Sequence, residues 1–224
     1  MKGQTREERK PARRECKRQR TMALFVQAAE QLIRTEGPSA VTIRRIAGST
    51  GYSSAALYSY FADLDELVLY ASLQYRRACL EEAAREIAPD MSALEQYRRF
   101  CEIFNRHALR APEIYLNMYF GRHSGRIEAV MDAYCRLFPG ALTGSAELSP
   151  GLPAWDCQPD GGRSAARRLA EEGYIRPENA DTVAELLLRT QESFLYGMTV
   201  DPQQDAEARN AAFLALFDRI IEAF

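Results

Sequence analysis

Apolar residues recur along this chain at the three- and four-residue spacing of amphipathic helices, and no segment alternates as a half-buried strand would. Between residues 21 and 36 the apolar positions fall on one face, and Gly37 and Pro38 follow where that helix must end. Further helices are expected at residues 63–87, 92–110, 113–120, 123–138, 164–172, 176–200 and 205–224. The pattern therefore predicts an all-α protein.

One long segment, residues 139–163, interrupts the helical pattern. Nine of its 25 residues are Gly or Pro, and it carries the single tryptophan, Trp155. Loops of this length without regular structure are usually functional or disordered. We therefore treat it as a candidate cover for a binding site.

Two short helical patterns meet at Gly51. Thr42 and Ser53 each precede one of them, and both hydroxyls suit an N-cap. Gly51 suits the turn because glycine adopts a positive φ without strain. Leu57 of the second pattern is expected to pack against Ile46 of the first. This layout predicts a helix-turn-helix, in which the second helix enters the major groove of DNA.

The outward residues of this motif are the candidate DNA contacts. Arg44 fits a phosphate, although an ordinary surface arginine is the alternative. Leu57 and Phe61 fill the inner face, which leaves Tyr58 and Tyr60 free to donate to phosphate oxygens. The short residues between them allow close approach to base edges. The expected DNA-contacting residues are Thr42, Arg44, Ser53, Ser54, Ala55, Ala56, Tyr58, Ser59 and Tyr60.

Three segments carry a resemblance to the TetR family of transcriptional regulators. They are AAEQLIRTEG in the first helix, VTIRRIA followed by GYS around the turn, and ALYSYF leading into DLDEL. The resemblance implies a three-helix, N-terminal helix-turn-helix head on a larger helical body for ligand binding and dimerisation. Many members carry a lysine just after the Tyr-Phe segment, where this chain has Leu64 between two aspartates. A phosphate contact typical of the family is therefore expected elsewhere.

Charge is distributed unevenly along the 224 residues, whose formal net charge is −2. Residues 1–65 hold twelve Lys/Arg and seven Asp/Glu, a net of +5, and the remainder holds seventeen and twenty-four, a net of −7. We expect a basic flexible arm at 1–20, the helix-turn-helix domain at 21–66 and the body at 67–224. A basic arm can hold phosphates or enter a minor groove, and here it would replace the absent lysine.

The composition also excludes several classes of protein. No apolar run approaches the ~20 residues that cross a membrane, and the N-terminus lacks a secretory signal. A cytoplasmic location without a membrane partner is therefore expected. The cysteines are odd in number and scattered, so a disulfide framework or zinc ribbon is not expected. They are Cys16, Cys79, Cys101, Cys135 and Cys157. Most suit a buried apolar role, and redox sensing by Cys16 or Cys157 is the alternative.

No catalytic or cofactor motif is found. The chain has no nucleophile elbow, no H-E-x-x-H and no phosphate-cradling glycine loop, so an enzyme of helical fold is not favoured. The only histidines, His107 and His123, lack the spacing of a metal site. We expect no cofactor and no bound metal.

Aromatic and methionine residues gather in the middle of the chain. Plain core packing is the alternative for each of them, and the family resemblance favours an apolar ligand cavity. The candidate ligand-binding residues are Phe104, His107, Tyr115, Met118, Tyr119, Met131, Tyr134, Trp155 and Phe194.

The last two helical patterns have wide apolar faces. In the TetR family, the corresponding helices pair with their symmetry mates, so the resemblance implies a homodimer. The candidate interface residues are Leu187, Phe194, Phe213, Phe217 and Ile220.

These features together predict a homodimeric, ligand-responsive regulator that binds double-stranded operator DNA. A repressor released by a small apolar molecule fits best. The alternative is a DNA-bound adaptor or architectural protein whose body binds a protein.

Overall fold

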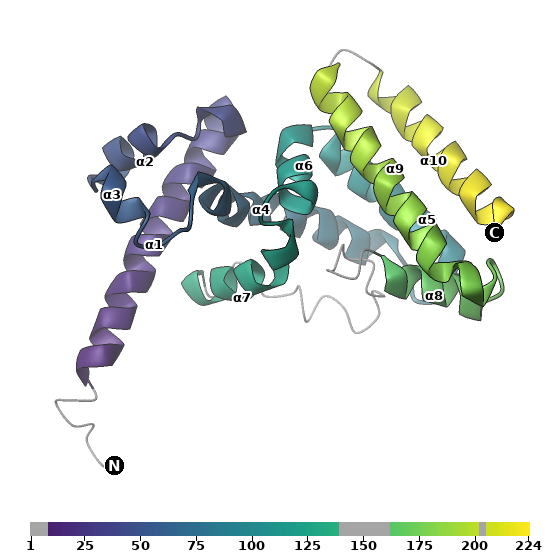
Figure 1. Cartoon of the computed structure of the whole chain (residues 1–224), viewed down its shortest axis with the longest axis horizontal. Helices are drawn as coiled ribbons and strands as arrows, with labels where there is room; N and C mark the ends of the chain where they lie inside the picture. Colours follow the sequence, from purple (N-terminus) through teal and green to yellow (C-terminus); the bar gives the residue numbers. More distant parts are fainter. Residues whose placement is uncertain (1–8, 139–161, 202–204) are drawn as a thin grey trace. The chain divides into compact units, whose positions relative to one another are not determined.

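All regular structure in the described parts of the chain, residues 9–138, 162–201 and 205–224 of a computed structural model, is helical, as expected (Figure 1). The α-helices are α1 (Arg9–Glu36), α2 (Ile43–Thr50), α3 (Ser54–Leu57), α4 (Leu64–Glu86), α5 (Ala93–Ala108), α6 (Pro112–Phe120), α7 (Ile127–Leu137), α8 (Arg163–Glu171), α9 (Ala180–Val200) and α10 (Ala206–Ala223). Short 3-10 helices are Pro38–Ala40, Ser124–Arg126 and Pro177–Asn179. In these ranges, no helix is long and apolar enough to span a bilayer.

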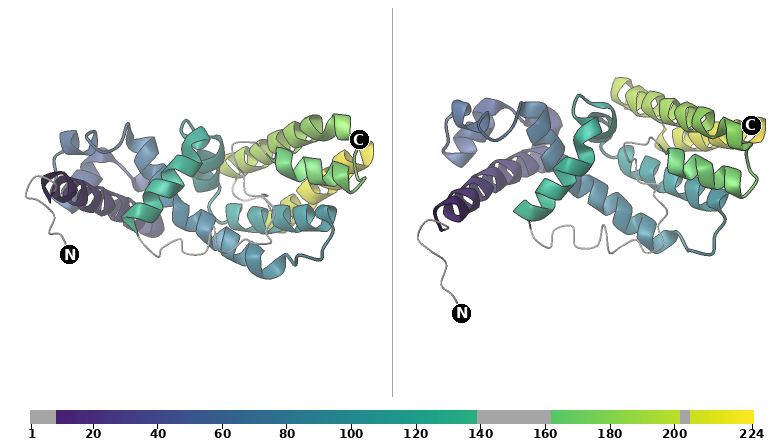
Figure 2. Two further views of the ribbon diagram at one scale, coloured as in Figure 1. Left: turned by 90° about the horizontal axis from the view of Figure 1, so that it is seen from below. Right: turned by 60° about the horizontal axis from the view of Figure 1, so that its bottom comes forward.

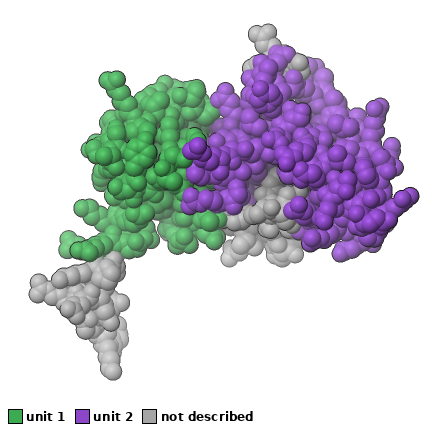
Figure 3. Space-filling model, viewed as in Figure 1, with its two compact units in different colours: residues 1–72, 129–141 green, residues 73–128, 142–224 purple. Residues whose placement is uncertain are grey.

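The chain divides into two compact units, coloured separately in Figure 3. The first, here called the head, comprises residues 1–72 and 129–141. The second, here called the body, comprises residues 73–128 and 142–224. The expected boundary after residue 66 and the observed one after Ser72 both fall inside α4. The inclusion of most of α7 in the head was not expected from the sequence.

Large apolar side chains from α1, α2, α3 and the turn after α3 form the core of the head. Phe25, Ile46, Leu57 and Phe61 are all buried, and Leu57 and Ile46 belong to the two helices of the turn motif. The rings of Phe25 and Phe61 meet edge to face at 6.2 Å between centroids. Full burial of such a side chain stabilises a fold by about 1.5–3 kcal/mol. This small core holds α2 and α3 against α1.

The first helix begins earlier than the sequence indicated. α1 starts at Arg9, so the expectation of a flexible arm is wrong for residues 9–20. Arg, Lys, Gln and Glu, which dominate this stretch, are good helix formers. Pro11 lies in the first turn, where its missing N–H breaks no helical hydrogen bond. The high charge of residues 9–20 is also typical of disordered tails, and for this reason the sequence predicted a flexible arm.

Helices α5, α8, α9 and α10 surround the core of the body, and α9 and α10 lie side by side (Figure 2). The Tyr97 and Phe217 rings meet at right angles, 5.3 Å apart. A fully buried amide links three of these helices: Asn105 donates to Asn210 Oδ1 at 2.9 Å and accepts from Gln191 Nε2 at 2.8 Å. Its polar atoms are thus satisfied without water.

Two helix starts expected from the sequence match the structure to different degrees. α5 begins at Ala93, directly after the expected start at residue 92, and Ser92 and Glu95 form a capping box with both reciprocal hydrogen bonds present. α9 begins at Ala180 and not near Arg176, because the Pro177–Asn179 3-10 turn precedes it.

Candidate nucleic-acid interface

The turn between α2 and α3 has the predicted capping geometry. Thr42 Oγ1 accepts from the Arg45 N–H at 3.3 Å, and Ser53 Oγ accepts from the Ala56 N–H at 3.2 Å. Gly51 ends α2 with a φ of 73°. These hydroxyls satisfy N–H groups that the helix itself leaves unpaired. The starts of both short helices and the turn between them are therefore determined by residues of this segment itself.

The second helix of the motif is shorter than the sequence predicted. α3 ends at Leu57, and residues 58–60 continue as a tight turn in which the Tyr60 N–H donates to the Leu57 carbonyl at 2.9 Å. We call residues 53–60 the recognition segment. Leu57 is buried, whereas Ser54, Ala55 and Ser59 are exposed and Ala56 is half-buried. The segment thus presents a polar, short-chained surface to solvent.

Tyr58 and Tyr60 differ in their surroundings. Tyr58 is 53% exposed, as a phosphate contact requires. The Tyr60 ring lies on Phe25, 5.6 Å between centroids, so it is half-buried and belongs in part to the head core. Arg18 lies over the Tyr60 ring at 5.3 Å and donates from Nη1 to the Ser59 carbonyl at 3.1 Å. Sequence reasoning missed Arg18, because it expected the arm to be flexible.

The two adjacent arginines of α2 have different partners. Arg45 binds Glu36 in a bidentate ion pair, with nitrogen–oxygen distances of 2.7 and 2.5 Å. Arg44 is exposed and makes no ion pair within the described parts of the chain. A cation without an acidic neighbour keeps its charge available to a phosphate. Arg44 is therefore the better candidate of the two.

Hydrogen bonds at the start of α4 account for two of the acids near Leu64, the position where a lysine is frequent in the resembled family. Asp63 Oδ1 accepts from the Glu66 N–H at 2.9 Å, and Glu66 Oε2 accepts from the Ala62 N–H at 2.6 Å. Carboxylates stabilise a helix N-terminus, where unpaired N–H groups gather. These carboxylates therefore stabilise the start of α4, and they provide no positive charge for a DNA phosphate.

The aromatic residues predicted to line a cavity pack against one another in the body. Phe104 lies 5.2 Å from the ring of Tyr115 and 5.2 Å from that of Tyr119. The buried Tyr115 hydroxyl donates to the Tyr75 carbonyl at 3.1 Å. Met118, which lies between Tyr115 and Tyr119 in the sequence, is fully buried. The structure therefore brings these residues together as interlocked packing.

His107 belongs to a charged cluster between α4 and α5. Its Nε2 lies 2.7 Å from Glu82 Oε2, and Arg106 donates to Glu82 Oε1 at 2.5 Å. Burial raises the pKa of Glu82, but these two partners outweigh it and hold the pKa below its ordinary value. Within the described ranges, no cluster of three metal-ligating side chains is present.

Two other candidate ligand residues, Met131 and Tyr134, belong to the head, so grouping them with the body set was wrong. The Tyr134 hydroxyl donates to Glu30 Oε1 of α1 at 2.7 Å. Spacing along one helix could not reveal this partner, which is distant in sequence. Trp155 and the loop of residues 139–161 lie outside the described residues.

The buried cysteines have the apolar role expected for most of them. Burial raises the pKa of both Cys79 and Cys101 to about 12, so neither thiol ionises near neutral pH. Cys16 is exposed, as expected, and Cys157 lies outside the described residues.

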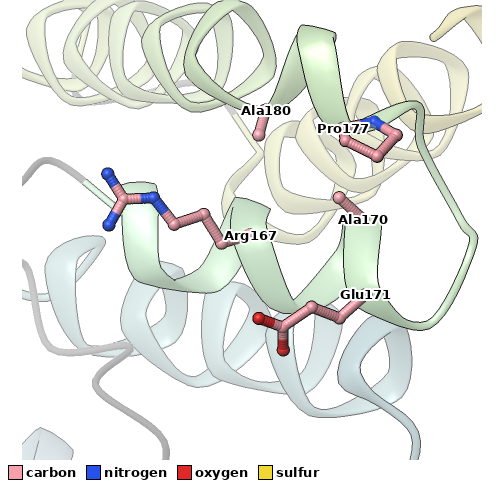
Figure 4. A pocket seen from close by; sticks show the side chains of 5 residues that line it. All are labelled: Arg167, Ala170, Glu171, Pro177 and Ala180. Carbon is pink, nitrogen blue, oxygen red and sulfur yellow. The ribbon is translucent and has the colours of Figure 1, made fainter.

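Two hollows open on the surface of the described part of the body. One, of about 240 Å³, has an apolar floor of Ala170, Pro177 and Ala180, and the charged ends of Arg167 and Glu171 point away from that proline (Figure 4). An open groove of about 440 Å³ runs along the contact between α6 and α9. Its lining residues are Leu116, Phe120, Arg189, Glu192, Ser193 and Tyr196. Neither hollow contains a residue predicted to bind ligand.

The predicted dimer residues are mostly covered within a single chain. Leu187, Phe213 and Phe217 are buried in the body core, which leaves them no surface for a second copy. Phe194 packs on Phe213 at 5.4 Å, and both Phe194 and Ile220 are only half-buried. The apolar periodicity was correct, but it identified the side of each helix that packs inward.

Other apolar residues of the same two helices are exposed. Leu186, Tyr196 and Val200 lie on one side of α9, within about 80° of arc at 3.6 residues per turn. Tyr196 is 61% and Val200 66% exposed, and Leu216 of α10 is also exposed. Exposed apolar residues gathered on one side are typical of an interaction surface.

Comparisons with known proteins agree with this geometry. Residues 25–71 match the sequence model of a family described as bacterial regulatory proteins, tetR family. The fold is similar to that of FadR from Thermus thermophilus, a TetR-family transcriptional repressor solved with lauroyl-CoA. The identity is 19%, the TM-score is 0.52, and 88% of this chain and 92% of that chain are covered.

A second similar structure is RolR bound to resorcinol. Its identity to this chain is 16%, its TM-score is 0.56, and 92% of this chain and 93% of that chain are covered. At these identities the likeness shows a shared fold. No curated protein matches the sequence.

Proposed function

We propose that this chain is a transcriptional regulator of the TetR type, because residues 25–71 in its head match the sequence model of that family, and that it acts as a homodimeric repressor that binds a near-palindromic operator. Its two recognition segments would enter successive major grooves, because the dimer axis would match the two-fold symmetry of the operator. The cytoplasm, where operator DNA is found, is the proposed location. The proposal concerns a binding protein and includes no catalytic step.

The recognition segment is the observation that carries this proposal. It has a side-chain cap at Ser53 and an exposed Tyr58, and it lies next to α2, which is capped by Thr42 and carries Arg44 without an acidic partner in the described chain. Base edges can be approached closely because residues 54–56 are Ser-Ala-Ala. With no Arg, Asn or Gln on the segment, direct base readout is sparse, and DNA shape is expected to contribute.

Selection of duplexes from a random library by the full-length protein tests the proposal without assuming an operator sequence. We expect a near-palindromic consensus. The affinity for the selected duplex should exceed that for a scrambled duplex by at least about 10³-fold at physiological salt. A failure to enrich any sequence, with equal affinity for selected and scrambled duplexes, would contradict the proposed regulator.

Dimerisation is proposed through the exposed residues of α9 and α10. Leu186, Tyr196, Val200 and Leu216 form an apolar surface that a second copy would cover. Sedimentation of the full-length protein at micromolar concentration should give the dimer mass. A monomer both alone and on DNA would exclude the symmetric arrangement.

Release by a small, mainly apolar molecule is the second part of the proposal. It is supported by the aromatic character of the body and by the ligands of the two similar structures. Lauroyl-CoA and resorcinol differ so much in size and charge that the fold alone does not name an effector. A compound panel screened by thermal shift and by release of the selected duplex tests this part. Quenching of Trp155 fluorescence gives an independent readout.

A body that binds a protein is the alternative, and the ring-to-ring packing of Phe104, Tyr115 and Tyr119 favours it. Under this alternative, no organic ligand enters that cluster, and the regulator acts on DNA as an adaptor. Persistent operator binding across the whole compound panel, with unchanged melting temperatures, would favour the adaptor over the ligand-responsive repressor.

A further inference from the structure

The N-terminal turns of α1 extend beyond the part of the helix that packs in the head. Packing begins at Thr21 and Phe25, both buried, whereas residues 13–18 and Arg20 are exposed. Figure 1 shows these purple turns continuing past α2 and α3. At 1.5 Å per residue, the stretch 9–20 is roughly 18 Å long. The head thus includes a helical projection that its own core does not require.

Three cations line one side of this projection. Arg13, Lys17 and Arg20 follow one another at intervals of four and three residues, which places them within about 60° of arc. All three are exposed, and none makes an ion pair in the described parts of the chain. The one acid in this exposed stretch, Glu15, lies on the opposite side and accepts from Gln19 at 3.1 Å. We call Arg13, Lys17 and Arg20 the α1 stripe.

Contacts of Arg18 fix the projection relative to the recognition segment. Its guanidinium donates to the Ser59 carbonyl and covers the Tyr60 ring, which itself packs on Phe25. Arg18 therefore joins the base of the projection to the C-terminal end of the surface proposed to read DNA. A duplex bound by residues 53–60 would lie beside a cationic helix held in a defined position.

We infer that the α1 stripe is a second DNA-binding surface, which holds backbone phosphates outside the stretch contacted by α2 and α3. The inference rests on the proposed function, because it concerns the same bound duplex. Phosphates supply the closely spaced negative charges that three aligned cations attract. At 3.4 Å per base pair, 18 Å of helix reaches at most about five base pairs of flanking DNA.

The width of the helix decides which part of the flanking DNA the stripe contacts. An α-helix with its side chains is about 10–12 Å across, whereas the minor groove of B-DNA is only about 6 Å wide. Residues 13–20 therefore lie along the backbone and do not enter the minor groove. Phosphate contacts carry no sequence information, so the stripe adds affinity and register without changing the consensus.

An anionic membrane is a poorer partner for this surface. Helices that lie on membranes place a broad apolar face opposite their cations. Here the opposite side carries Glu15 and Gln19, and no large apolar residue occurs between residues 12 and 20. The stripe therefore suits a polyanion approached from water.

The test compares full-length wild type with Arg13→Gln/Lys17→Gln/Arg20→Gln on two duplexes. One duplex ends at the selected consensus, and the other adds about six arbitrary base pairs on each side. Wild type should bind the longer duplex at least about tenfold tighter, and the triple variant should lose this gain. The slope of log affinity against log salt should shrink by about 2.7 per bound head, at about 0.9 per phosphate contact.

Glutamine keeps helix propensity and removes only charge, so the variant is expected to remain folded. The matched control, Arg110→Gln/Arg167→Gln/Arg176→Gln, removes the same charge from exposed positions of the body. This control should keep the wild-type gain in affinity from the longer duplex and the wild-type slope of log affinity against log salt. Lys17→Gln alone should lower the slope by about 0.9, which gives a smaller change to measure if the triple variant melts early.

The outcomes separate this inference from the proposed function. Suppose that wild type prefers the selected duplex, but the triple variant and its control have equal salt slopes and equal gains in affinity from the longer duplex. This result would overturn the inference and leave the proposed regulator intact. Loss of slope in the triple variant on every duplex, without any sequence preference in wild type, would support the stripe and contradict the regulator.

Discussion

Three exposed cations of the head and two arginines of the body differ in whether an acid pairs with them. In the head, Arg13, Lys17 and Arg44 are exposed, and no acid pairs with them in the described chain. In the body, Arg98 binds Asp218 at 3.0 Å, and Arg106 binds Glu82 at 2.5 Å. Exposed ion pairs of this kind contribute only about 0–1 kcal/mol each. The ion pairs therefore contribute little to stability. Their main consequence is that they neutralise cations, so that a surface whose cations have no acidic partner stays electropositive.

This difference shows why net charge is a poor guide to partners. A formal charge of −2 would argue against nucleic acid, yet cations without acidic neighbours line the projection and α2 of the head. Body cations such as Arg110, Arg167 and Arg176 are exposed as well, but they lie on separate elements. Only aligned cations can hold successive phosphates.

The largest effect is expected from opening the filled aromatic cluster of the body. Phe104→Ala should lower the free energy of unfolding by about 3–5 kcal/mol, because the ring contacts Tyr115 and Tyr119 and its removal leaves a cavity. Denaturant titration measures this loss. Tyr174→Ala, at an exposed site of the same unit outside α9 and α10, should change stability by less than about 0.5 kcal/mol. A loss below about 1 kcal/mol for Phe104→Ala would show that the cluster is loosely packed.

Breaking the proposed dimer should weaken operator binding without unfolding the body. Leu186→Glu/Leu216→Glu places charges on exposed positions of α9 and α10, so sedimentation should give monomers. Operator affinity should fall at least about 100-fold, equivalent to about 2.8 kcal/mol, because each half-site is then bound singly. Phe217→Glu, by contrast, should unfold the body, since Phe217 is fully buried.

The matched control for the dimer variant is Tyr174→Glu, at an exposed site outside both helices. It should remain dimeric and bind operator normally. Dimers of unchanged affinity for Leu186→Glu/Leu216→Glu would remove this surface from the interface.

A smaller effect is expected from the recognition segment itself. Arg44→Ala should weaken operator binding about tenfold and reduce the salt slope by about 0.9, as expected for one phosphate contact. Arg45→Ala is the adjacent control, and it should lose less, because Arg45 is already paired with Glu36. Tyr58→Phe should lose a few-fold, the value of one neutral hydrogen bond. Equal losses at Arg44 and Arg45 would make the pairing argument wrong.

The smallest effect concerns Glu30, a half-buried carboxyl in the head. Burial raises the pKa of Glu30, although the hydrogen bond from Tyr134 opposes this. Because the folded pKa is raised, Glu30 favours the folded state when protonated, and this contribution is lost as pH rises through that pKa. Glu30→Gln should therefore raise the melting temperature at pH 7 by at most about 2–4 °C.

Lowering the pH from 7 towards 5 should stabilise wild type relative to Glu30→Gln. Glu15→Gln, on the exposed part of α1, should not show this behaviour. A melting temperature that falls on Glu30→Gln substitution at pH 7 would contradict the assigned direction.

Local chemistry made part of the head predictable from sequence. The caps at Thr42 and Ser53 and the turn at Gly51 depend on neighbours within three or four residues, so they were predicted correctly. The helical state of residues 9–20 was missed, because a charge-rich stretch also suits disorder. The contacts of Arg18 with Ser59 and Tyr60 depend on the fold and leave no trace in local sequence.

The body was less predictable, because periodicity reports that a helix has an apolar side but not what covers it. Phe217 was assigned to a partner chain and is instead covered by its own. Phe104 and Tyr115 were correctly expected to lie together, yet sequence could not decide whether they line a space or fill it. Tyr134 was grouped with them, although its partner Glu30 lies in the head.

Amide hydrogen exchange of the full-length protein, with and without the selected duplex, tests most directly whether the head is the DNA-binding unit. The duplex should slow exchange in peptides covering residues 42–60 and leave α8 of the body unchanged. Protection confined to the body, with no change at residues 42–60, would contradict the assignment of DNA binding to the head.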